Sequence, residues 1–102
     1  MDKIKVFKMI NGEEIIAEVF NVFADYIELK SPAQIVMQQT KEGVGVALAP
    51  YMPYATGNIE LHKQAIASSA VPDVKMENEY SRLFGSGIEI APASALAGLQ
   101  MP

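Results

Sequence analysis

The chain has 102 residues, of which half are apolar or aromatic and a fifth are charged. This length suits one domain and is too short for two, so we expect a single domain over residues 1–102. No apolar run approaches the ~20 residues that cross a bilayer. The net charge of −4 disfavours broad, nonspecific binding to nucleic acid, so any RNA contact must be local and depend on a few placed residues.

The chain has no cysteine, which excludes disulfides, thiolate zinc sites and cysteine nucleophiles and fits a reducing cytoplasm. The first ten residues, MDKIKVFKMI, alternate charged and apolar side chains and do not have the pattern of a signal peptide. The sequence has no Gly-rich phosphate loop, no Gly-x-Ser-x-Gly motif and no histidine paired with a nucleophile. We therefore expect a cytoplasmic protein that is not an enzyme, needs no cofactor and does not bind membranes.

Hydrophobic alternation with a period of two predicts β-strands through most of residues 1–72. Asn11-Gly12 is the strongest hairpin signal, because both residues tolerate a positive φ. Pro32 cannot donate a backbone hydrogen bond, so it marks either a bulge or the end of a strand. The predicted strands span residues 2–10, 13–22, 26–31, 34–40, 44–49, 59–61 and 65–71. The pattern indicates a mainly β fold, a small and strongly bent barrel of five or more strands.

Three further segments have other patterns. Residues 50–58, PYMPYATGN, predict an irregular insertion in the barrel, because two prolines and a glycine exclude a long central strand. Asp73 is a good N-cap for one helix over residues 73–85. The apolar stripe predicted for this helix consists of Met76, Tyr80, Leu83 and Phe84. Residues 91–102 carry few packing or charge cues, and we expect a mobile tail there.

Two segments resemble the Sm-like family. The first, INGEEIIAEVFNVFADYIELK (residues 10–30), has a hairpin with a Gly turn, a bent strand, an aromatic residue after a short turn and then alternating apolar positions. Its matching residues are Asn11, Gly12, Phe23, Tyr26, Ile27 and Leu29. The second, HKQAIASSAVP (residues 62–72), is similar to the Tyr-Lys-His-Ala-Ile run of bacterial Hfq, which precedes a polar strand and a proline. Its matching residues are Lys63, Ala65, Ile66, Ser68, Val71 and Pro72.

The extra hairpin and the late helix are similar to short Sm-like proteins of cyanophage-type tailed phages. The resemblance implies a bent barrel whose outer strands pair between subunits, giving a homo-oligomeric ring of five to seven copies. Such a ring would bind single-stranded, uridine- or adenosine-rich RNA around its pore, through Tyr26, Lys63 and Gln64. Lysines gathered by symmetry would form a local positive collar on an acidic body. The implied setting is RNA metabolism or regulation in the cytoplasm of an infected bacterium.

The sequence also departs from the family pattern. Glu28 stands where Sm proteins place an asparagine near the pore-facing aromatic, and a carboxylate repels phosphate unless it reads a base donor. Ala24 occupies the place of the family's aspartate, and Gln64 replaces the histidine of Hfq. The N-terminal helix of the family has no counterpart in the strand pattern. These departures favour an alternative function, a non-enzymatic structural or protein-interaction ring that binds no RNA.

The RNA-binding candidates also have ordinary structural interpretations. Tyr26 can stack on a base, but a strand tyrosine can equally pack against Lys30 or another neighbour. Lys63 and Gln64 can contact a nucleotide, but polar residues are normal in a solvated turn. The sequence leaves both interpretations open.

The insertion and the single histidine have alternatives of the same kind. Prolines that fix the chain and tyrosines with flat amphipathic area are suited to protein contacts, which makes Tyr51, Met52 and Tyr54 a candidate interaction site. The insertion can equally cap the end of its own barrel. His62 shares a strand face with Glu60, so a weak metal site is conceivable, but a surface histidine is far commoner. We expect no metal site.

Overall fold

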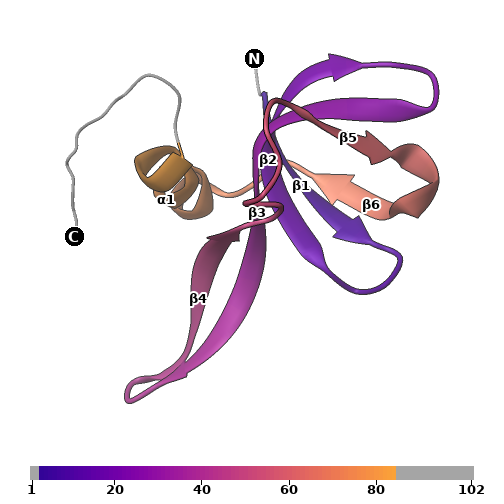
Figure 1. The fold of residues 1–102 in the computed structure, drawn as a ribbon. Coiled ribbons are helices and arrows are strands. Elements are labelled where there is room, and N and C mark those ends of the chain that lie inside the picture. The colour runs from indigo at the N-terminus through magenta and orange to yellow at the C-terminus, as the bar shows by residue number, and fades with distance from the viewer. Residues whose placement is uncertain (1–2, 85–102) are drawn as a thin grey trace.

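The computed structural model describes residues 3–84, which form a mainly β fold, as predicted (Figure 1). Six strands make one antiparallel sheet, and one helix follows them at the C-terminal end of the described residues. The elements are β1 (Ile4–Met9), β2 (Glu14–Val22), β3 (Tyr26–Thr40), β4 (Gly43–Pro50), β5 (Ile59–His62), the 3-10 turn η1 (Lys63–Ala65), β6 (Ile66–Ala70) and α1 (Val74–Phe84). The predicted tail, residues 91–102, lies outside the described residues.

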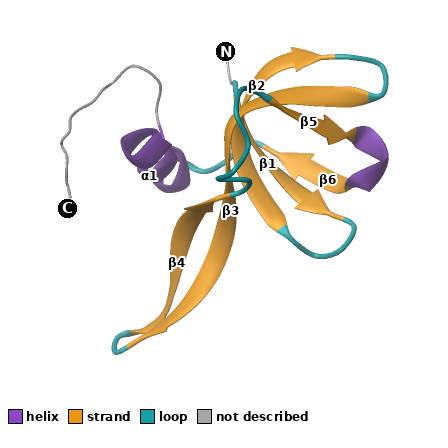
Figure 2. Cartoon of the chain, in the orientation of Figure 1, coloured by secondary structure: helices purple, strands orange, loops and turns teal. Residues whose placement is uncertain are grey.

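The strands follow the order β4-β3-β2-β1-β6, and β5 pairs with β3 (Figure 2). The first part of β3 lies between β2 and β5. Its second part pairs with β4, and the two strands project from the rest of the molecule as a long hairpin (Figure 1). We call residues 36–47 of this hairpin the arm, and the sheet formed by β1, β2, β5, β6 and the first part of β3 the body.

The Asn11-Gly12 turn joins β1 to β2, which confirms the predicted hairpin. Gly12 has a φ of +96°, a conformation that side chains with a Cβ rarely adopt. The side-chain oxygen of Asn11 accepts a hydrogen bond from the N–H of Glu13 at 3.0 Å. Local chemistry therefore fixes this turn.

Pro32 lies in a bulge and does not end the third strand. Between Lys30 and Ala33, the pairing of β3 with β2 shifts by one residue, so β3 carries one residue more than its partner. Ser31, next to the proline, has a φ of +52°, the only positive φ of a non-glycine residue in the described part of the chain. Of the two alternatives that the sequence left open at Pro32, the bulge is therefore confirmed and the strand end is wrong, since β3 continues through the bulge as one 15-residue strand.

The bulge reverses which face of the sheet receives the apolar side chains of β3. One extra residue shifts the two-residue alternation of a strand by one position. Before the bulge, Ile27 and Leu29 pack into a cluster on one face. After it, Ala33 and Ile35 pack into a cluster on the opposite face. A single strand therefore contributes to both cores.

The two clusters lie on opposite faces of β2. The buried residues of the first cluster are Phe7, Met9, Ile15, Ala17, Leu29 and Leu61. Those of the second are Ile16, Ala33 and Tyr80, with side chains of β1, β3, β4 and α1 packed around them. Successive residues of β2 point to opposite faces, so both sides of this central strand are covered.

Helix α1 covers the second cluster. The Oδ1 atom of Asp73 accepts a hydrogen bond from the N–H of Met76 at 2.7 Å, which confirms the predicted N-cap. Met76, Tyr80 and Phe84 pack into the cluster. The fourth residue of the predicted stripe, Leu83, is 45% exposed, so this part of the prediction was wrong. By helical periodicity, Leu83 lies at the margin of the stripe.

Tyr80 attaches the helix to the bulge. Its hydroxyl lies 2.7 Å from the carbonyl oxygen of Ser31 and 3.1 Å from that of Lys30, and it can donate to either. Burial raises the pKa of Tyr80 to about 12, because the charged phenolate is disfavoured away from water. Among residues 3–84, no helix has the length and apolar character needed to cross a membrane.

Candidate nucleic-acid interface

Tyr26, Lys63 and Gln64, the predicted RNA-binding residues, line one open hollow of about 550 Å³. The pairing of β3 with β5 brings them together, since Tyr26 lies opposite His62 in the register. The N–H of Lys63 donates to the carbonyl oxygen of Asp25 at 2.9 Å and extends this ladder by one bond. The other residues that line the hollow are Ala24, Asp25, Glu60 and His62.

The turn η1 presents Lys63 and Gln64 to solvent. His62 and the residue after the turn are both extended, so the chain makes one 3-10 turn between two strands. Ala65, the last residue of the turn, packs against the first cluster, and its carbonyl oxygen accepts a hydrogen bond from the N–H of Ile10 at 2.9 Å. The turn is therefore anchored by its apolar residue, while its polar residues are exposed.

Three rings form an aromatic ledge at the edge of the hollow. The ring of Tyr26 stacks on Phe23 with a centroid distance of 4.8 Å, and the imidazole of His62 lies 5.9 Å away on a tilted plane. Phe23 is 43% exposed. Flat aromatic surfaces of this kind can stack nucleic-acid bases without demanding one sequence. Tyr26 therefore packs on two neighbours, Phe23 and His62.

Sequence reasoning missed Phe23 and His62 as neighbours of Tyr26. The sequence did contain a signal for Phe23, because only the two-residue break Ala24-Asp25 separates it from Tyr26. In the structure the N–H of Phe23 donates to the carbonyl oxygen of Tyr26 at 2.9 Å, which closes this tight turn and brings the two rings together. His62 depends on the cross-strand pairing of β3 with β5, which the sequence does not specify.

Carboxylates outnumber cations around the hollow. Asp25 and Glu60 line it together with a single lysine, Lys63. Glu28 lies directly opposite Glu60 in the β3–β5 register and accepts a hydrogen bond from the side-chain amide of Asn21 at 3.2 Å. One copy of the chain therefore offers one phosphate partner and several acceptors for the amino groups of bases.

His62 and Glu60 do not extend into a larger set of metal ligands. Within residues 3–84, no three or more histidine, aspartate or glutamate side chains gather closely enough to hold a metal ion. Protein metal sites of the common kinds use at least three protein ligands. His62 is an exposed residue whose ring contributes to the aromatic ledge.

The three candidate interaction residues of the insertion have different environments. Tyr51 packs against the first cluster, and its hydroxyl donates to Oε1 of Glu13 at 3.3 Å. Burial, together with the charge of Glu13, raises the pKa of Tyr51. Met52 lines a separate hollow of about 380 Å³ beside the end of α1, and Tyr54 is 82% exposed. Tyr51 thus acts as a cap on the body, while Tyr54 faces solvent.

No protein-family model matches the sequence, and no curated protein matches it.

Proposed function

We propose that this chain is an Sm-like subunit of a homo-oligomeric ring that binds single-stranded RNA at its pore through Tyr26, Lys63 and Gln64. One observation carries the proposal. These three residues come from the two separate segments that resemble the family, and they line the same hollow beside an aromatic ledge. The ring size of five to seven copies, the uridine- or adenosine-rich substrate and the phage setting are parts of the proposal that come from the resemblance.

A bent barrel is supported by the composition of the first cluster. Its buried side chains come from β1, β2, β3 and β5, and Ile66 of β6 packs against them. A core to which five strands contribute side chains is the arrangement expected of a small barrel. We propose that the body bends in this way, with the arm outside the barrel.

Assembly into a ring is supported by two open strand edges. In the described residues, β5 pairs only with β3, and β6 pairs only with β1. Along an antiparallel ladder, directly opposite residues alternate between pairs that are hydrogen-bonded and pairs that are not. Lys63 is hydrogen-bonded to Asp25, so the next pairs, formed by His62 and Glu60 with β3, alternate from it. The backbone N–H and C=O groups of Glu60 and His62 therefore point away from β3. Unpaired edge groups are templates for another chain. Pairing of β5 with β6 of the next copy would repeat η1 at every junction.

The chemistry of binding follows from the residues of the hollow. A base stacked on the ledge of Tyr26 contributes ~1–3 kcal/mol. Lys63 pairs with a phosphate, and its repetition around the ring offsets the acidic charge of each copy. Gln64 can donate to and accept from base edges, while Glu60 can only accept. The site therefore selects exposed single-stranded bases over a duplex, whose bases are already stacked and paired.

The test measures the anisotropy of fluorescein-labelled oligo-U and oligo-A at low salt, where electrostatic contacts are strongest. Lys63→Glu should abolish binding while light scattering shows an unchanged ring. Lys41→Glu is the matched control, since it makes the same charge change in the turn of the arm and should bind normally. Absence of binding by the unaltered protein overturns the RNA proposal, and a monomer in light scattering overturns the ring.

The carboxylates at the hollow favour a second candidate, a structural or protein-interaction ring without RNA. Glu28 and Glu60 face each other across two strands, which places like charges side by side. The same experiment separates the two candidates, because an intact ring that retains neither oligonucleotide at low salt supports the second.

A further inference from the structure

The outward face of the β3–β5 ladder carries rings and carboxylates in neighbouring rows. Leu61 is buried in the first cluster, so Glu60 and His62 on either side of it point to the opposite face. His62 lies directly opposite Tyr26 in the register. Two residues further along, Glu60 lies directly opposite Glu28. A row of two rings therefore lies beside a row of two carboxylates.

The spacing of the two rows suits a base that stacks on the rings. Residues on the same face of a strand are ~6.5–7 Å apart. A base stacked on Tyr26 can turn its polar edge toward the carboxylate row. One hydrogen bond of ~2.9 Å and the length of a glutamate side chain then span the gap. The face can therefore hold a base by its ring and read its edge at the same time.

Glu60 is the carboxylate of this face that is available to a base. It is exposed and lines the hollow that Tyr26, Lys63 and Gln64 also line, which we call the RNA hollow. Within residues 3–84, its side chain has neither a hydrogen-bond partner nor an ion-pair partner. The carboxylate row also contains a second member, but that one accepts from the side-chain amide of Asn21 at 3.2 Å.

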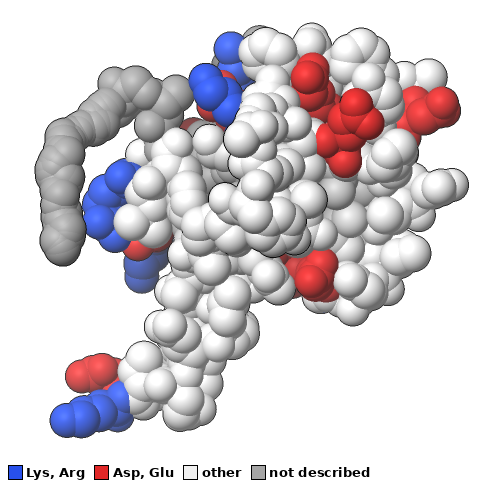
Figure 3. Space-filling model, viewed as in Figure 1, with Lys and Arg blue, Asp and Glu red and all other residues white. Residues whose placement is uncertain are grey.

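The surface around the RNA hollow is acidic. In Figure 3, the charged atoms over the β2–β3 hairpin and β5, at the upper right of the view, are acidic. Asp25, Glu28 and Glu60 belong to these elements and to the turn between β2 and β3. An ionised carboxylate accepts hydrogen bonds and donates none. A nucleic acid bound here therefore gains most from bases that present donors.

The four bases of RNA differ in what they offer to a carboxylate. Cytosine and adenine each have an exocyclic amino group, and guanine has an amino group beside a ring N–H. Uracil has no amino group, and its one ring N–H lies between two carbonyl oxygens, which a carboxylate repels. A carboxylate next to a stacked base therefore discriminates against uracil.

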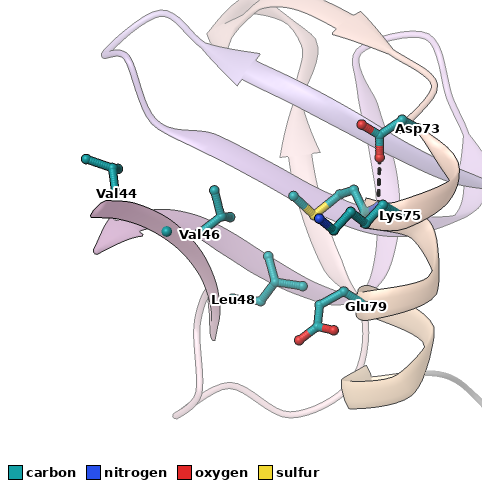
Figure 4. A pocket seen from close by; sticks show the side chains of 8 residues that line it. Val44, Val46, Leu48, Asp73, Lys75 and Glu79 are labelled. Carbon is teal, nitrogen blue, oxygen red and sulfur yellow. Dashed lines mark hydrogen bonds between the residues drawn. The ribbon is translucent and has the colours of Figure 1, made fainter. Parts of the chain in front are cut away.

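The hollow of about 490 Å³ between β4 and α1 provides a contrast (Figure 4). No aromatic ring is present among the described residues that line it, so it offers no stacking surface. Both of its carboxylates already have partners, since Asp73 caps α1 and Glu79 pairs with Arg82 at 2.7 Å. Rings and an unpartnered carboxylate occur together at the RNA hollow and not at this one.

We propose that Glu60 makes the RNA hollow selective for bases with an exocyclic amino group, so that cytidine- or adenosine-rich single strands bind more tightly than oligo-uridine. This inference rests on the proposed function and narrows its substrate. Lys63 meets phosphates, which are the same in every sequence. Gln64 both donates and accepts, so it does not distinguish an amino group from a carbonyl. Glu60 therefore decides the choice of base.

The test compares fluorescein-labelled oligo-C and oligo-U of equal length by anisotropy. Both are pyrimidine strands with the same phosphates, and their bases differ in the edge that a carboxylate would meet. The ratio of the two Kd values therefore isolates the reading of that edge from the phosphate contacts. In the unaltered protein, oligo-C should bind roughly tenfold more tightly than oligo-U.

Glu60→Gln assigns the preference to one side chain. The glutamine amide can donate to a uracil carbonyl and can still accept from an amino group, so the preference should fall to about twofold or less. Any loss of repulsion between residue 60 and phosphate acts on both probes and cancels in the ratio. Glu42→Gln is the matched control, because it makes the same charge change at an exposed residue in the turn of the arm and should leave the ratio unchanged. Light scattering checks that each variant keeps the assembly of the unaltered protein.

The outcomes separate this inference from the proposed function. Equal affinity of the unaltered protein for oligo-C and oligo-U overturns the inference and leaves RNA binding in place. A preference for oligo-C that is undiminished in Glu60→Gln also overturns it, since another group would then read the base. Absence of binding to oligo-C, oligo-A and oligo-U overturns the proposed function, and the inference with it.

Discussion

The body and the arm contain similar apolar residues, but these side chains are buried in the body and exposed in the arm. In the body, Ile15 and Ile16 on successive positions of β2 are both 0% exposed, because each face of that strand carries a core. In the arm, Met37 is 68% exposed and Val44 is 67% exposed. Burial of apolar surface contributes ~25 cal/mol per Å², so the body side chains are explained by folding and the arm side chains are not. The exposed side chains of the arm therefore contribute little to the folding of the described residues.

The largest effect expected from this comparison is on stability. Ile16→Ala should lower the free energy of unfolding by ~2–5 kcal/mol, because it opens a cavity between β2 and α1. Val46→Ala shortens a side chain that is already 50% exposed and should cost less than ~1 kcal/mol. Urea denaturation of the two variants measures both. A cost for Val46→Ala as large as that for Ile16→Ala would break the comparison, since it would mean that the arm is already covered in the free protein.

The next effect concerns Tyr80, which joins α1 to the bulge of β3. Tyr80→Phe leaves the carbonyl groups at the bulge without their hydroxyl partner and should cost ~1–2 kcal/mol. The pKa of Tyr80 is raised by burial to about 12 from an ordinary value of 10.0, so the folded state holds this proton more tightly than the unfolded state. Its contribution to stability is therefore complete below pH 10 and is lost as the pH rises toward 12.

Urea midpoints between pH 8 and pH 12 test this assignment. The unaltered protein should lose stability steeply over the upper part of that range, and Tyr80→Phe should lose less. Tyr54→Phe is the matched control, because Tyr54 is 82% exposed and its removal should leave the profile unchanged. If the urea midpoint depended on pH in the same way in Tyr80→Phe and in the unaltered protein, the hydroxyl of Tyr80 would not be what links α1 to the bulge.

Features fixed by neighbouring residues could be predicted from the sequence. The Asn11-Gly12 turn, the mainly β pattern and the N-cap at Asp73 each depend on a few adjacent residues. The grouping of Tyr26 with Lys63 and Gln64 came from the resemblance to the Sm-like family, and the structure brings these residues to one hollow.

Features that depend on distant contacts could not be predicted. Pro32 reads as a bulge or a strand end from local chemistry alone, and the outcome involves Tyr80, whose hydroxyl bonds to the bulge from a helix far along the chain. The ring of His62 meets Tyr26 only through the β3–β5 pairing. The exposure of Leu83 depends on what packs against that side of α1, which helical periodicity does not specify.

The smallest effect is expected at the bulge, where the body passes into the arm. A φ of +52° at Ser31 costs a residue with a Cβ ~1–2 kcal/mol, whereas glycine adopts this conformation freely. Ser31→Gly keeps the carbonyl that accepts from Tyr80, but it also gives the unfolded chain more freedom, so the gain in stability should be below ~1 kcal/mol.

Ser69→Gly gives this prediction its sharpest control. Ser69 pairs with Phe7 in ordinary extended backbone, so glycine there gains nothing in the folded state and should destabilise by ~0.5–1 kcal/mol. The two serine-to-glycine changes should therefore shift the urea midpoint in opposite directions. Equal destabilisation by both would show that the backbone at Ser31 is not left-handed in solution. The bulge would then not explain how β3 turns its apolar side chains from the core of the body to the face beneath α1.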